Sequence, residues 1–321
     1  KASNKLVIST WGLSEDLWKE NIFAPFEKKY GVDVVLEVGN NSERLTKLQN
    51  NPNSNIDLMY LAESFAEQGI KGNLFEKVDY SKIENSKSLI DVAKKTKDRG
   101  YGPAYTLNSI GIVVDSLAGI EINSWEDLWK PELKGKIAIP DITTTNGPAI
   151  LSIAADKAGV PLESDNGKAA FKELEALKPN VVKTYSKSSD LANMFSSGEI
   201  VAAIAADFAF DTITNVKAEA KYVVPTSGTY LNFNTININK NSKNKDLAYK
   251  FINYLLSEEV QLRAAENLGD SPVNKNVKLD ESKIGNLTYG SIVESGKTLD
   301  YEFVNSKMNS WVDSWNRIMN Q

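Results

Sequence analysis

The sequence contains no cysteine and no histidine. Without cysteine, the chain cannot form disulfides, thiolate nucleophiles, zinc–thiolate sites or iron–sulfur clusters. Without histidine, it lacks Ser–His and Cys–His catalytic pairs, histidine general bases and histidine-ligated metals. We therefore expect no cofactor and no metal site. The two absences favour ligand binding without chemistry over catalysis.

Long apolar runs and an excess of positive charge are also missing. The longest apolar runs, Ala149–Ala155 and Ile200–Ala206, are core-sized, whereas a membrane span needs roughly 18 residues. Lys and Arg number 37 against 42 Asp and Glu, a net charge of −5, and no basic stripe is visible. This excludes a typical nucleic-acid partner. The 321 residues, 41% of them hydrophobic, are enough for two globular domains.

Strand and helix patterns alternate along the first part of the chain. The predicted strands are Leu6–Ser9, Val32–Val38 and Ile56–Leu61, and the predicted helices are Glu15–Tyr30, Ser42–Asn50 and Glu63–Gly72. Pro25 must bend or interrupt the first helix, Gly31 suits its C-terminal end, and Ser42 is a possible N-cap of the second. This alternation predicts an α/β fold with mostly parallel sheets flanked by helices.

The rest of the chain extends this pattern. Further predicted strands are Ile110–Val114, Lys136–Ile139, Val181–Thr184, Val201–Ala205, Tyr222–Val224 and Tyr230–Asn237. Further predicted helices are Pro148–Ala158, Lys245–Leu256 and Glu302–Met319, with a short helix at Ser124–Leu128. Ser124 and Asp127 have the spacing of a capping box.

The loops that follow strands are the first candidates for a ligand site, because open α/β sheets bind ligands at the carboxyl ends of their strands. Trp11 follows the first strand, and Glu63 and Ser64 follow the third. A turn rich in hydroxyl groups leads from Asp141 into a helix, where free N–H groups suit an anion. Its residues are Thr143, Thr144, Thr145, Asn146 and Gly147. The alternative is plain capping of that helix.

Three other motifs have simpler explanations. Gly290–Thr298 is not a P-loop, because five residues separate its glycines instead of four. Asp207 and Asp211 are spaced like a carboxylate pair, but acids are also common at helix starts. The tryptophans spaced four apart, Trp125 with Trp129 and Trp311 with Trp315, favour helix-face packing.

Several segments together are similar to one family. The segment from Ser124 to Asp141 (SWEDLWKPELKGKIAIPD) resembles the middle of extracellular solute-binding proteins of bacterial ABC importers. The segments Asn4–Trp11, Ile56–Met59, Asn244–Leu256 and Trp311–Arg317 support the resemblance. The similar cluster within the family binds polyamines, thiamine, aminoethylphosphonate or ferric ion.

The resemblance implies a two-lobed periplasmic-binding-protein-like fold with the ligand in a cleft between the lobes. Lobe 1 would comprise residues 1–109 and 237–289, and lobe 2 residues 110–236 and 290–321. The partners would be a small solute and a membrane permease, and the chain would be a monomer. It would act outside the cytoplasm, either periplasmic or lipid-anchored, with Lys1 following a removed signal.

The resemblance also bears on the ligand. Iron is disfavoured, because the family's ferric binders use adjacent tyrosines and this sequence has no Tyr-Tyr pair. Polyamine binders carry acids at positions matched here by Ile142, Thr145 and Asn234. Their aromatic partners match Ala205 or Ala206, and Asn232. A dication needs carboxylates to offset its desolvation.

These matches lead to one preferred ligand and several alternatives. We expect a small polar solute with a phosphate, phosphonate or carboxylate group bound by the turn Thr143–Gly147. The other candidate contacts are Trp11, Glu63, Ser64, Tyr105, Asp141, Asp207, Tyr230 and Asn232. One alternative is a polyamine held by Glu63, Asp141 and Asp207 against Trp11. More distant alternatives are a hydrolase that uses Asp207 and Asp211, and a purely structural or adhesive surface protein.

Overall fold

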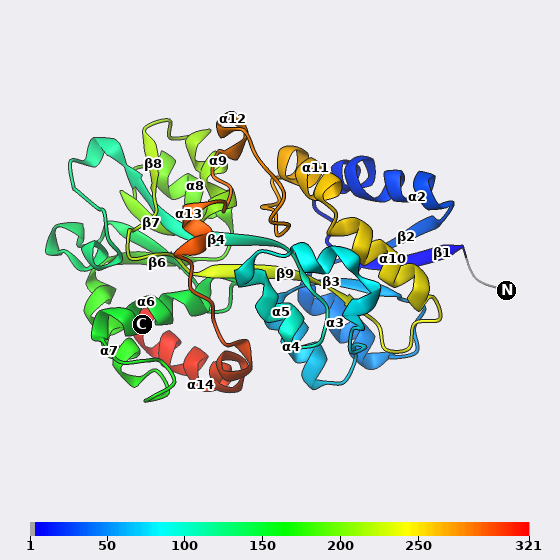
Figure 1. Ribbon diagram of the computed structural model, residues 1–321. Coiled ribbons are helices and arrows are strands. Elements are labelled where there is room, and N and C mark those ends of the chain that lie inside the picture. Colours follow the sequence, from blue (N-terminus) through cyan, green and yellow to red (C-terminus); the bar gives the residue numbers. More distant parts are fainter. Residues whose placement is uncertain (1–3, 321) are drawn as a thin grey trace. The chain divides into compact units, whose positions relative to one another are not determined.

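The computed structural model describes residues 4–320, which fall into two compact units, each with its own sheet and helices (Figure 1). Unit 1 spans residues up to Leu107 together with Phe233–Tyr289, and unit 2 comprises Asn108–Asn232 and Gly290–Gln321. The sequence placed these divisions after residues 109, 236 and 289. The predicted processing point at Lys1 lies outside the described residues. Among residues 4–320, no helix combines the length and apolar character of a membrane span.

The sheet of unit 1 consists of three parallel strands and one antiparallel strand. Its strands are β1 (Lys5–Thr10), β2 (Asp33–Val38), β3 (Leu58–Ala62) and the part of β9 (Leu231–Ile238) from Phe233 onward. The order is β2-β1-β3-β9, and Ala62 lies opposite Asn234 in the antiparallel pair. Every residue of β3 is buried, as expected for a strand covered on both faces.

Helices cover this sheet. They are α1 (Glu15–Trp18), α2 (Ala24–Tyr30), α3 (Asn41–Asn50), α4 (Glu63–Lys71), α5 (Lys94–Asp98), α10 (Lys245–Leu255), α11 (Glu258–Leu268) and α12 (Glu281–Ile284). The predicted interruption of the first helix is a π-helical turn, Lys19–Phe23, ahead of Pro25, and Gly31 ends α2 with φ 63°. The prediction of Ser42 as an N-cap is wrong. Asn40 caps α3, because its backbone is extended and its side chain accepts the Glu43 N–H at 2.8 Å.

The sheet of unit 2 mixes parallel and antiparallel strands in the order β6-β5-β7-β4-β8. Its strands are the part of β4 (Ala104–Asp115) from Asn108 onward, β5 (Ile137–Pro140), β6 (Val181–Tyr185), β7 (Ala202–Ala206) and β8 (Ala220–Val223). Strand β5 is parallel to β6 and β7, whereas β4 is antiparallel to β7 and β8. Strand β4 is therefore longer than the predicted Ile110–Val114.

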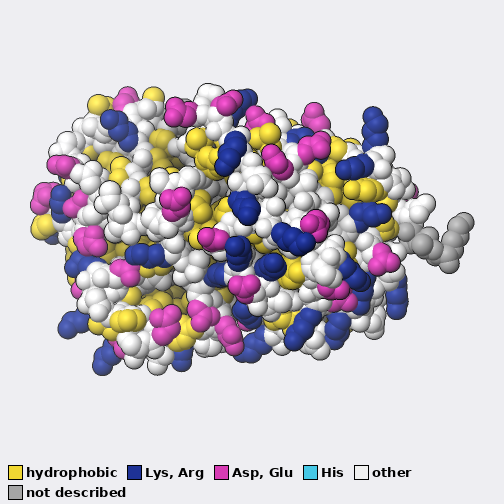
Figure 2. Space-filling view, in the orientation of Figure 1, with side chains coloured by type: hydrophobic (Ala, Val, Ile, Leu, Met, Phe, Trp, Pro, Cys, Tyr) yellow, Lys and Arg dark blue, Asp and Glu magenta, His cyan; other side chains and the backbone are white. Residues whose placement is uncertain are grey.

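Unit 2 has a second set of helices. They are α6 (Gly147–Ala158), α7 (Lys168–Leu177), α8 (Ser188–Ser196), α9 (Phe210–Thr214), α13 (Ser291–Glu294) and α14 (Tyr301–Met319). The predicted capping box of Ser124 and Asp127 is confirmed at a 3-10 helix, Trp125–Trp129. Trp311 and Trp315 are buried on α14, which confirms packing for this pair. On the face shown in Figure 2, basic and acidic side chains are intermixed.

Candidate functional site

The carboxyl ends of β1, β2 and β3 lie at one edge of the unit 1 sheet, because these strands are parallel. We call this the unit 1 edge. Trp11, Glu63 and Ser64 follow these strand ends, and Asn234 joins them because β9 runs antiparallel to β3. Open α/β sheets bind ligands at such an edge. The structure therefore brings together three of the predicted site residues.

Aromatic rings form a cluster beside this edge. Tyr60 packs edge-on against Tyr105 with ring centres 4.9 Å apart, and edge-on against Trp18 at 5.4 Å. Trp11 lies 6.0 Å from Tyr60. We call Trp11, Trp18, Tyr60 and Tyr105 the aromatic cluster. The sequence singled out Trp11 and Tyr105 but missed the other two.

The hydroxyl group of Tyr60 is an unusual feature of this cluster. Tyr60 is fully buried, and its hydroxyl has no hydrogen-bond partner among residues 4–320. A buried hydroxyl without a partner costs about 1–3 kcal/mol. Such a cost is typical of a group that a ligand satisfies. The sequence signal that could have identified Tyr60 is its place as a single tyrosine within an otherwise apolar strand.

A buried guanidinium group lies behind Trp11. The Arg44 carbon Cζ is 5.3 Å from the centre of the indole ring. Its Nε donates to the Gly39 carbonyl at 2.9 Å and its Nη1 donates to the Ser9 hydroxyl at 3.0 Å. Burial lowers the pKa of Arg44 to about 10, so it stays charged at neutral pH. Arg44 therefore holds one face of Trp11 by a cation–π contact.

The charge of Glu63 is compensated by an ion pair within unit 1. Its Oε1 pairs with the Lys95 ammonium at 2.8 Å, and its Oε2 has no partner among the described residues. Burial raises the pKa of Glu63, although the Lys95 charge opposes the shift. Ser64 is partly buried in the first turn of α4. Of these two residues, Glu63 offers one free oxygen and little uncompensated charge.

Asp270 is an acidic residue that the sequence analysis did not select. It follows Gly269, which ends α11 with φ 70°, and precedes Ser271, whose carbonyl accepts the Thr106 hydroxyl at 2.8 Å. Its side chain is partly exposed, and no hydrogen bond or charged neighbour among residues 4–320 contributes to the shift of its pKa. Burial raises the pKa of Asp270 to about 7. Burial raises the pKa values of Tyr60 and Tyr105, and the charge of Asp270 adds to both shifts.

The corresponding edge of unit 2 follows the parallel strands β5 and β7. We call it the unit 2 edge. Asp141 follows β5 and Asp207 follows β7, while antiparallel β4 places Ile110 opposite Ala206. Asp207 is buried and its Oδ1 accepts the Phe208 N–H at 2.7 Å. The Phe208 ring, in contrast, is 62% exposed. Asp211 is exposed on α9.

The hydroxyl-rich turn of this edge closes on its own aspartate. The Asp141 Oδ2 accepts the N–H of Thr143 at 3.1 Å and its hydroxyl at 2.5 Å. The Thr144 hydroxyl donates to the Asp141 carbonyl at 2.6 Å, and the Trp315 indole N–H donates to Oδ1 at 3.2 Å. Thr143 thus donates to a carboxylate of the chain, and the Thr144 hydroxyl donates to a backbone carbonyl. An added anion would face the Asp141 charge.

The remaining residues of the turn have mixed environments. Thr145 is exposed, and Asn146 occupies the N-cap position of α6 without a side-chain capping bond. Gly147 is required, since a Cβ there would lie 2.2 Å from the Asp141 carbonyl oxygen. Its N–H donates to the Thr144 carbonyl at 3.1 Å. The turn is therefore a compact capping structure.

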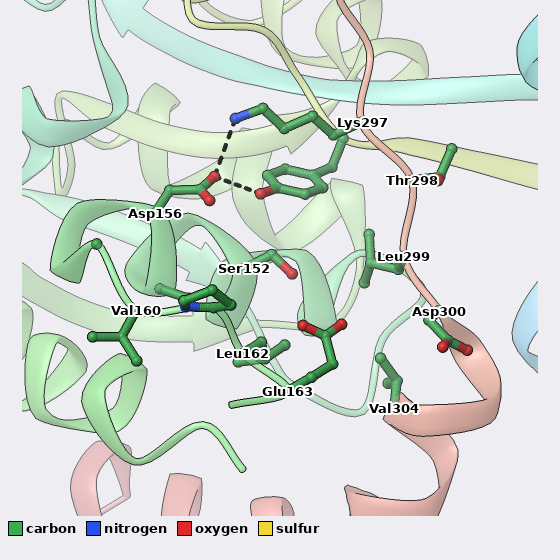
Figure 3. A pocket seen from close by; sticks show the side chains of 14 residues that line it. Ser152, Asp156, Val160, Leu162, Glu163, Lys297, Thr298, Leu299, Asp300 and Val304 are labelled. Carbon is green, nitrogen blue, oxygen red and sulfur yellow. Dashed lines mark hydrogen bonds and ion pairs between the residues drawn. The ribbon is translucent and has the colours of Figure 1, made fainter. Parts of the chain in front are cut away.

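Tyr230 and Asn232 differ although they are close in sequence. The Tyr230 hydroxyl donates to Asp156 Oδ2 at 2.5 Å, and the Lys297 ammonium binds the same oxygen at 3.2 Å. These three residues line a pocket of about 510 Å³ within unit 2, where Asp156 and Lys297 are joined by the contact drawn in Figure 3. Asn232 is 4% exposed, and neither its amide oxygen nor its amide nitrogen has a partner in the described structure. Asn232 is therefore the stronger ligand candidate.

Across residues 4–320, no group of three or more Asp and Glu side chains is positioned to hold a metal ion.

Comparisons with known proteins give one consistent result. The family model of the bacterial extracellular solute-binding proteins matches residues 21–286. A spermidine/putrescine-binding periplasmic protein of Escherichia coli K12 is 28% identical over 253 residues, 76% of this chain and 71% of the relative. The likeness confirms the family resemblance drawn from the sequence.

Solved structures agree. The crystal structure of an ABC transporter from Clostridium perfringens is 70% identical, with a TM-score of 0.95 and coverage of 98% of this chain and 99% of that chain. The spermidine/putrescine substrate-binding protein PotD of Streptococcus pneumoniae, solved with calcium and HEPES, is 22% identical. Its TM-score is 0.78, and the match covers 97% of this chain and 98% of that chain. The predicted fold is therefore confirmed.

Proposed function

Because the chain belongs to the bacterial extracellular solute-binding proteins, we propose that it captures a small cationic amine of the polyamine kind. The chain is the solute-binding component of an ABC importer, and proteins of this kind deliver small solutes to a membrane permease. The amine replaces the anionic solute that we preferred from the sequence. It is the alternative that the sequence left open.

The observation that carries this proposal is the aromatic cluster with its unsatisfied polar groups. Aromatic faces attract ammonium groups, by about 0.5–2 kcal/mol each. Tyr60 offers a hydroxyl without a partner, and Asp270 offers a carboxylate without a cation. These groups suit a cation with an apolar stem.

Two further observations favour an amine over an anion. In the turn Thr143–Gly147, the hydroxyls of Thr143 and Thr144 already donate to Asp141. The relatives from Escherichia coli and Streptococcus pneumoniae are named for spermidine and putrescine. At 28% and 22% identity these names support the ligand class and leave the individual amine open.

This chain differs from polyamine binders at the positions that the sequence comparison matched to their acids. Ile142 is 1% exposed and belongs to the core of unit 2, so it has no role in binding a cation. Thr145 and Asn234 are neutral. We infer that fewer acids bind the ligand here, and that the ligand is a short amine with one or two charges. The predicted cleft between lobes, the monomeric state, the lipid anchor and the absence of enzymatic activity stay predictions.

A thermal-shift panel tests the amine proposal. The wild-type chain is mixed with putrescine, cadaverine, spermidine, 4-aminobutyrate, phosphate, aminoethylphosphonate and thiamine phosphate. An amine present at about a thousandfold its Kd should stabilise the protein by about 4 kcal/mol, which is several degrees in Tm. A shift with phosphate or a phosphonate, and none with any amine, would restore the anionic reading.

A further inference from the structure

The pocket drawn in Figure 3 lies at the end of α6 that is farther from the unit 2 edge, and we call it the α6 pocket. Its wall includes Asp156 in the last turn of α6, whereas the turn of the unit 2 edge leads into Gly147 at the start of that helix. At a rise of about 1.5 Å per residue, these two residues are about 14 Å apart along the helix axis. The α6 pocket therefore lies apart from the turn of the unit 2 edge.

Backbone pairing and shared side-chain bonds hold one wall of this pocket in place. The Lys297 N–H donates to the Thr229 carbonyl at 2.8 Å, and the Leu231 N–H donates to the Lys297 carbonyl at 2.7 Å. The side chains of Tyr230 and Lys297 both bind the Asp156 carboxylate. The Lys297 ammonium also lies 5.5 Å from the centre of the Tyr230 ring. The wall is thus formed before any ligand arrives, which lowers the cost of binding.

Part of the lining is apolar. Leu162, Leu299 and Val304 line the pocket, and all three side chains are buried. They come from the loop after α6, the segment before α14 and α14 itself. Sites for small molecules combine such a surface with a few polar groups that orient the ligand. This lining suits a short hydrocarbon stem.

Two polar side chains point into the space above this lining. Figure 3 shows the Ser152 hydroxyl and the Glu163 carboxylate directed toward one another across the pocket. Ser152 is 8% exposed, and its hydroxyl forms no hydrogen bond with another residue of the range 4–320. Glu163 takes part in none of the ion pairs among the described residues. Buried polar groups are usually hydrogen-bonded, so Ser152 marks a place where a ligand supplies the partner.

The charge of the pocket favours a cation. Asp156, Glu163 and Asp300 line it together with one basic residue, Lys297. Lys297 is paired with Asp156 at 3.2 Å, and Asp300 caps α14 through its Oδ1. An anion would face three carboxylates, whereas a cation would gain the carboxylate of Glu163. The acids do not form one of the groups of three that hold a metal ion, since none is found across the described residues. An organic cation can bridge groups that are more widely spaced.

We propose that the α6 pocket is a second binding site, which takes a small organic cation: an ammonium or guanidinium group on a short apolar stem. The charged group binds Glu163 and donates a further N–H to the Ser152 oxygen, since such a group carries several donors. The stem packs on Leu162 and Leu299. This inference goes beyond the proposed function, because it concerns a pocket within unit 2 and holds whichever solute the importer delivers.

The test is equilibrium dialysis of the full chain against labelled putrescine and labelled butylamine, from about 1 µM to about 10 mM. The measurement counts the molecules bound per chain. Each amine should fill the α6 pocket, and putrescine should also fill the site of the proposed function, which gives two molecules per chain. Binding in the α6 pocket should weaken severalfold between about 50 mM and about 200 mM salt, because its charged groups are partly exposed and screened.

Substitutions assign the second site to the pocket. Ser152→Leu should abolish binding there, because the larger side chain fills the space between the polar groups. Glu163→Gln should weaken it about tenfold, since an interaction with a charged partner is lost. The matched control is Glu132→Gln, which removes an exposed acid of unit 2 outside the pocket and should leave the count and both affinities unchanged.

The outcomes separate this inference from the proposed function. One putrescine per chain, bound equally by wild type and Ser152→Leu, would overturn the α6 pocket and keep amine capture. A second molecule that still binds to Ser152→Leu would overturn it as well, because its site would lie elsewhere. Binding that is lost in Ser152→Leu and kept in Trp11→Ala would support the pocket and contradict the proposed function.

Two further results are decisive. No binding of either amine would overturn both proposals. The count for the wild type needs no variant, and Glu163→Gln changes an exposed side chain, so a misfolded Ser152→Leu would not remove the test.

Discussion

The unit 1 edge and the unit 2 edge have similar strand arrangements, but they differ in how many of their polar groups have hydrogen-bond partners. Each lies at the carboxyl ends of parallel strands and carries acidic residues. At the unit 2 edge, the Asp141 carboxylate accepts hydrogen bonds from Thr143 and Trp315, and the Asp141 carbonyl accepts one from Thr144. At the unit 1 edge, the Tyr60 hydroxyl and Glu63 Oε2 have no hydrogen-bond partner among the described residues. The same topology thus produces one edge that is mostly closed by its own bonds and one that is open to a ligand.

This difference shows that the carboxyl ends of strands indicate where a site lies but not which of its polar groups bind the ligand. A carboxylate with four lone-pair directions can serve the ligand only if the chain leaves some of them free. Asp141 uses acceptor positions of its carboxylate for hydrogen bonds in the turn that leads into α6. Asn232 is the exception on unit 2, because its amide is buried without partners.

The largest effect expected from this comparison is a dependence of stability on pH. Burial raises the pKa of Asp270 from 3.8 to about 7, so between these values the folded chain binds a proton that the unfolded chain releases. The free energy of unfolding should therefore fall as pH rises from 4 to 7, by up to about 4 kcal/mol from this residue.

Urea unfolding at pH 4.5 and pH 7.5 measures this dependence. Asp270→Asn should remove its own share, so the variant should be more stable than wild type at pH 7.5 and similar at pH 4.5. A pH dependence identical in both proteins would mean that Asp270 is solvated, and the contrast between the edges would weaken.

Removal of the ring at the end of β1 should have the next largest effect. Trp11→Ala should weaken putrescine binding by about twofold to thirtyfold, because the ring contact with the ligand is lost. Trp11→Phe should recover much of the affinity, since a smaller aromatic face remains. Calorimetry checks both, and equal affinity in Trp11→Ala would exclude Trp11 from the site.

On unit 2, Asn232 can be compared with another buried asparagine. Asn232→Leu should raise the free energy of unfolding by about 1 kcal/mol, because an unsatisfied amide is replaced by an apolar group of similar size. It should also weaken amine binding. Asn180 donates to the carbonyls of Leu128 and Lys130 at 2.8 and 2.9 Å.

Asn180→Leu should therefore do the opposite and destabilise the chain by about 1–3 kcal/mol, with amine affinity unchanged. Denaturant unfolding and calorimetry of both variants make the test. Similar destabilisation in the two would show that Asn232 already has partners that the free protein supplies.

The smallest effect is expected in the closed turn. Thr144→Glu should cost about 1 kcal/mol of stability through the lost bond to the Asp141 carbonyl, and should change amine affinity by about twofold or less. The original anionic interpretation predicts loss of binding instead. A large loss of affinity with unchanged stability would bring the turn back into the site.

The periodic elements were predictable because their signal is local. The strand Ile137–Pro140 and the helix Lys245–Leu255 lie within one residue of their predicted bounds. The prediction of helix caps was wrong where two nearby residues could each serve as the cap. Asn40 and Ser42 can both cap a helix, and the extended backbone of Asn40 decided between them.

The candidate site was predicted in part. Trp11 and Glu63 lie at the unit 1 edge as expected, and Asn232 is buried with an unsatisfied amide. The role of Tyr230 as a ligand contact is not supported by its position, because its hydroxyl is bound to Asp156. Asp270 follows a helix and no strand, so a search of strand ends passed over it.

The sequence by itself determined the family, the α/β alternation, the exclusion of thiol and imidazole chemistry, and the loops where strands end. The family follows from the resemblance of several segments to known members. The other features follow from composition and from the spacing of apolar residues, which act over a few neighbours. Tertiary structure alone decided which polar groups are paired. The side chains of Asp141 and Trp315 form a hydrogen bond although the two residues are 174 positions apart in the chain. Whether a carboxylate is saturated or free depends on such distant partners, and no local pattern records them.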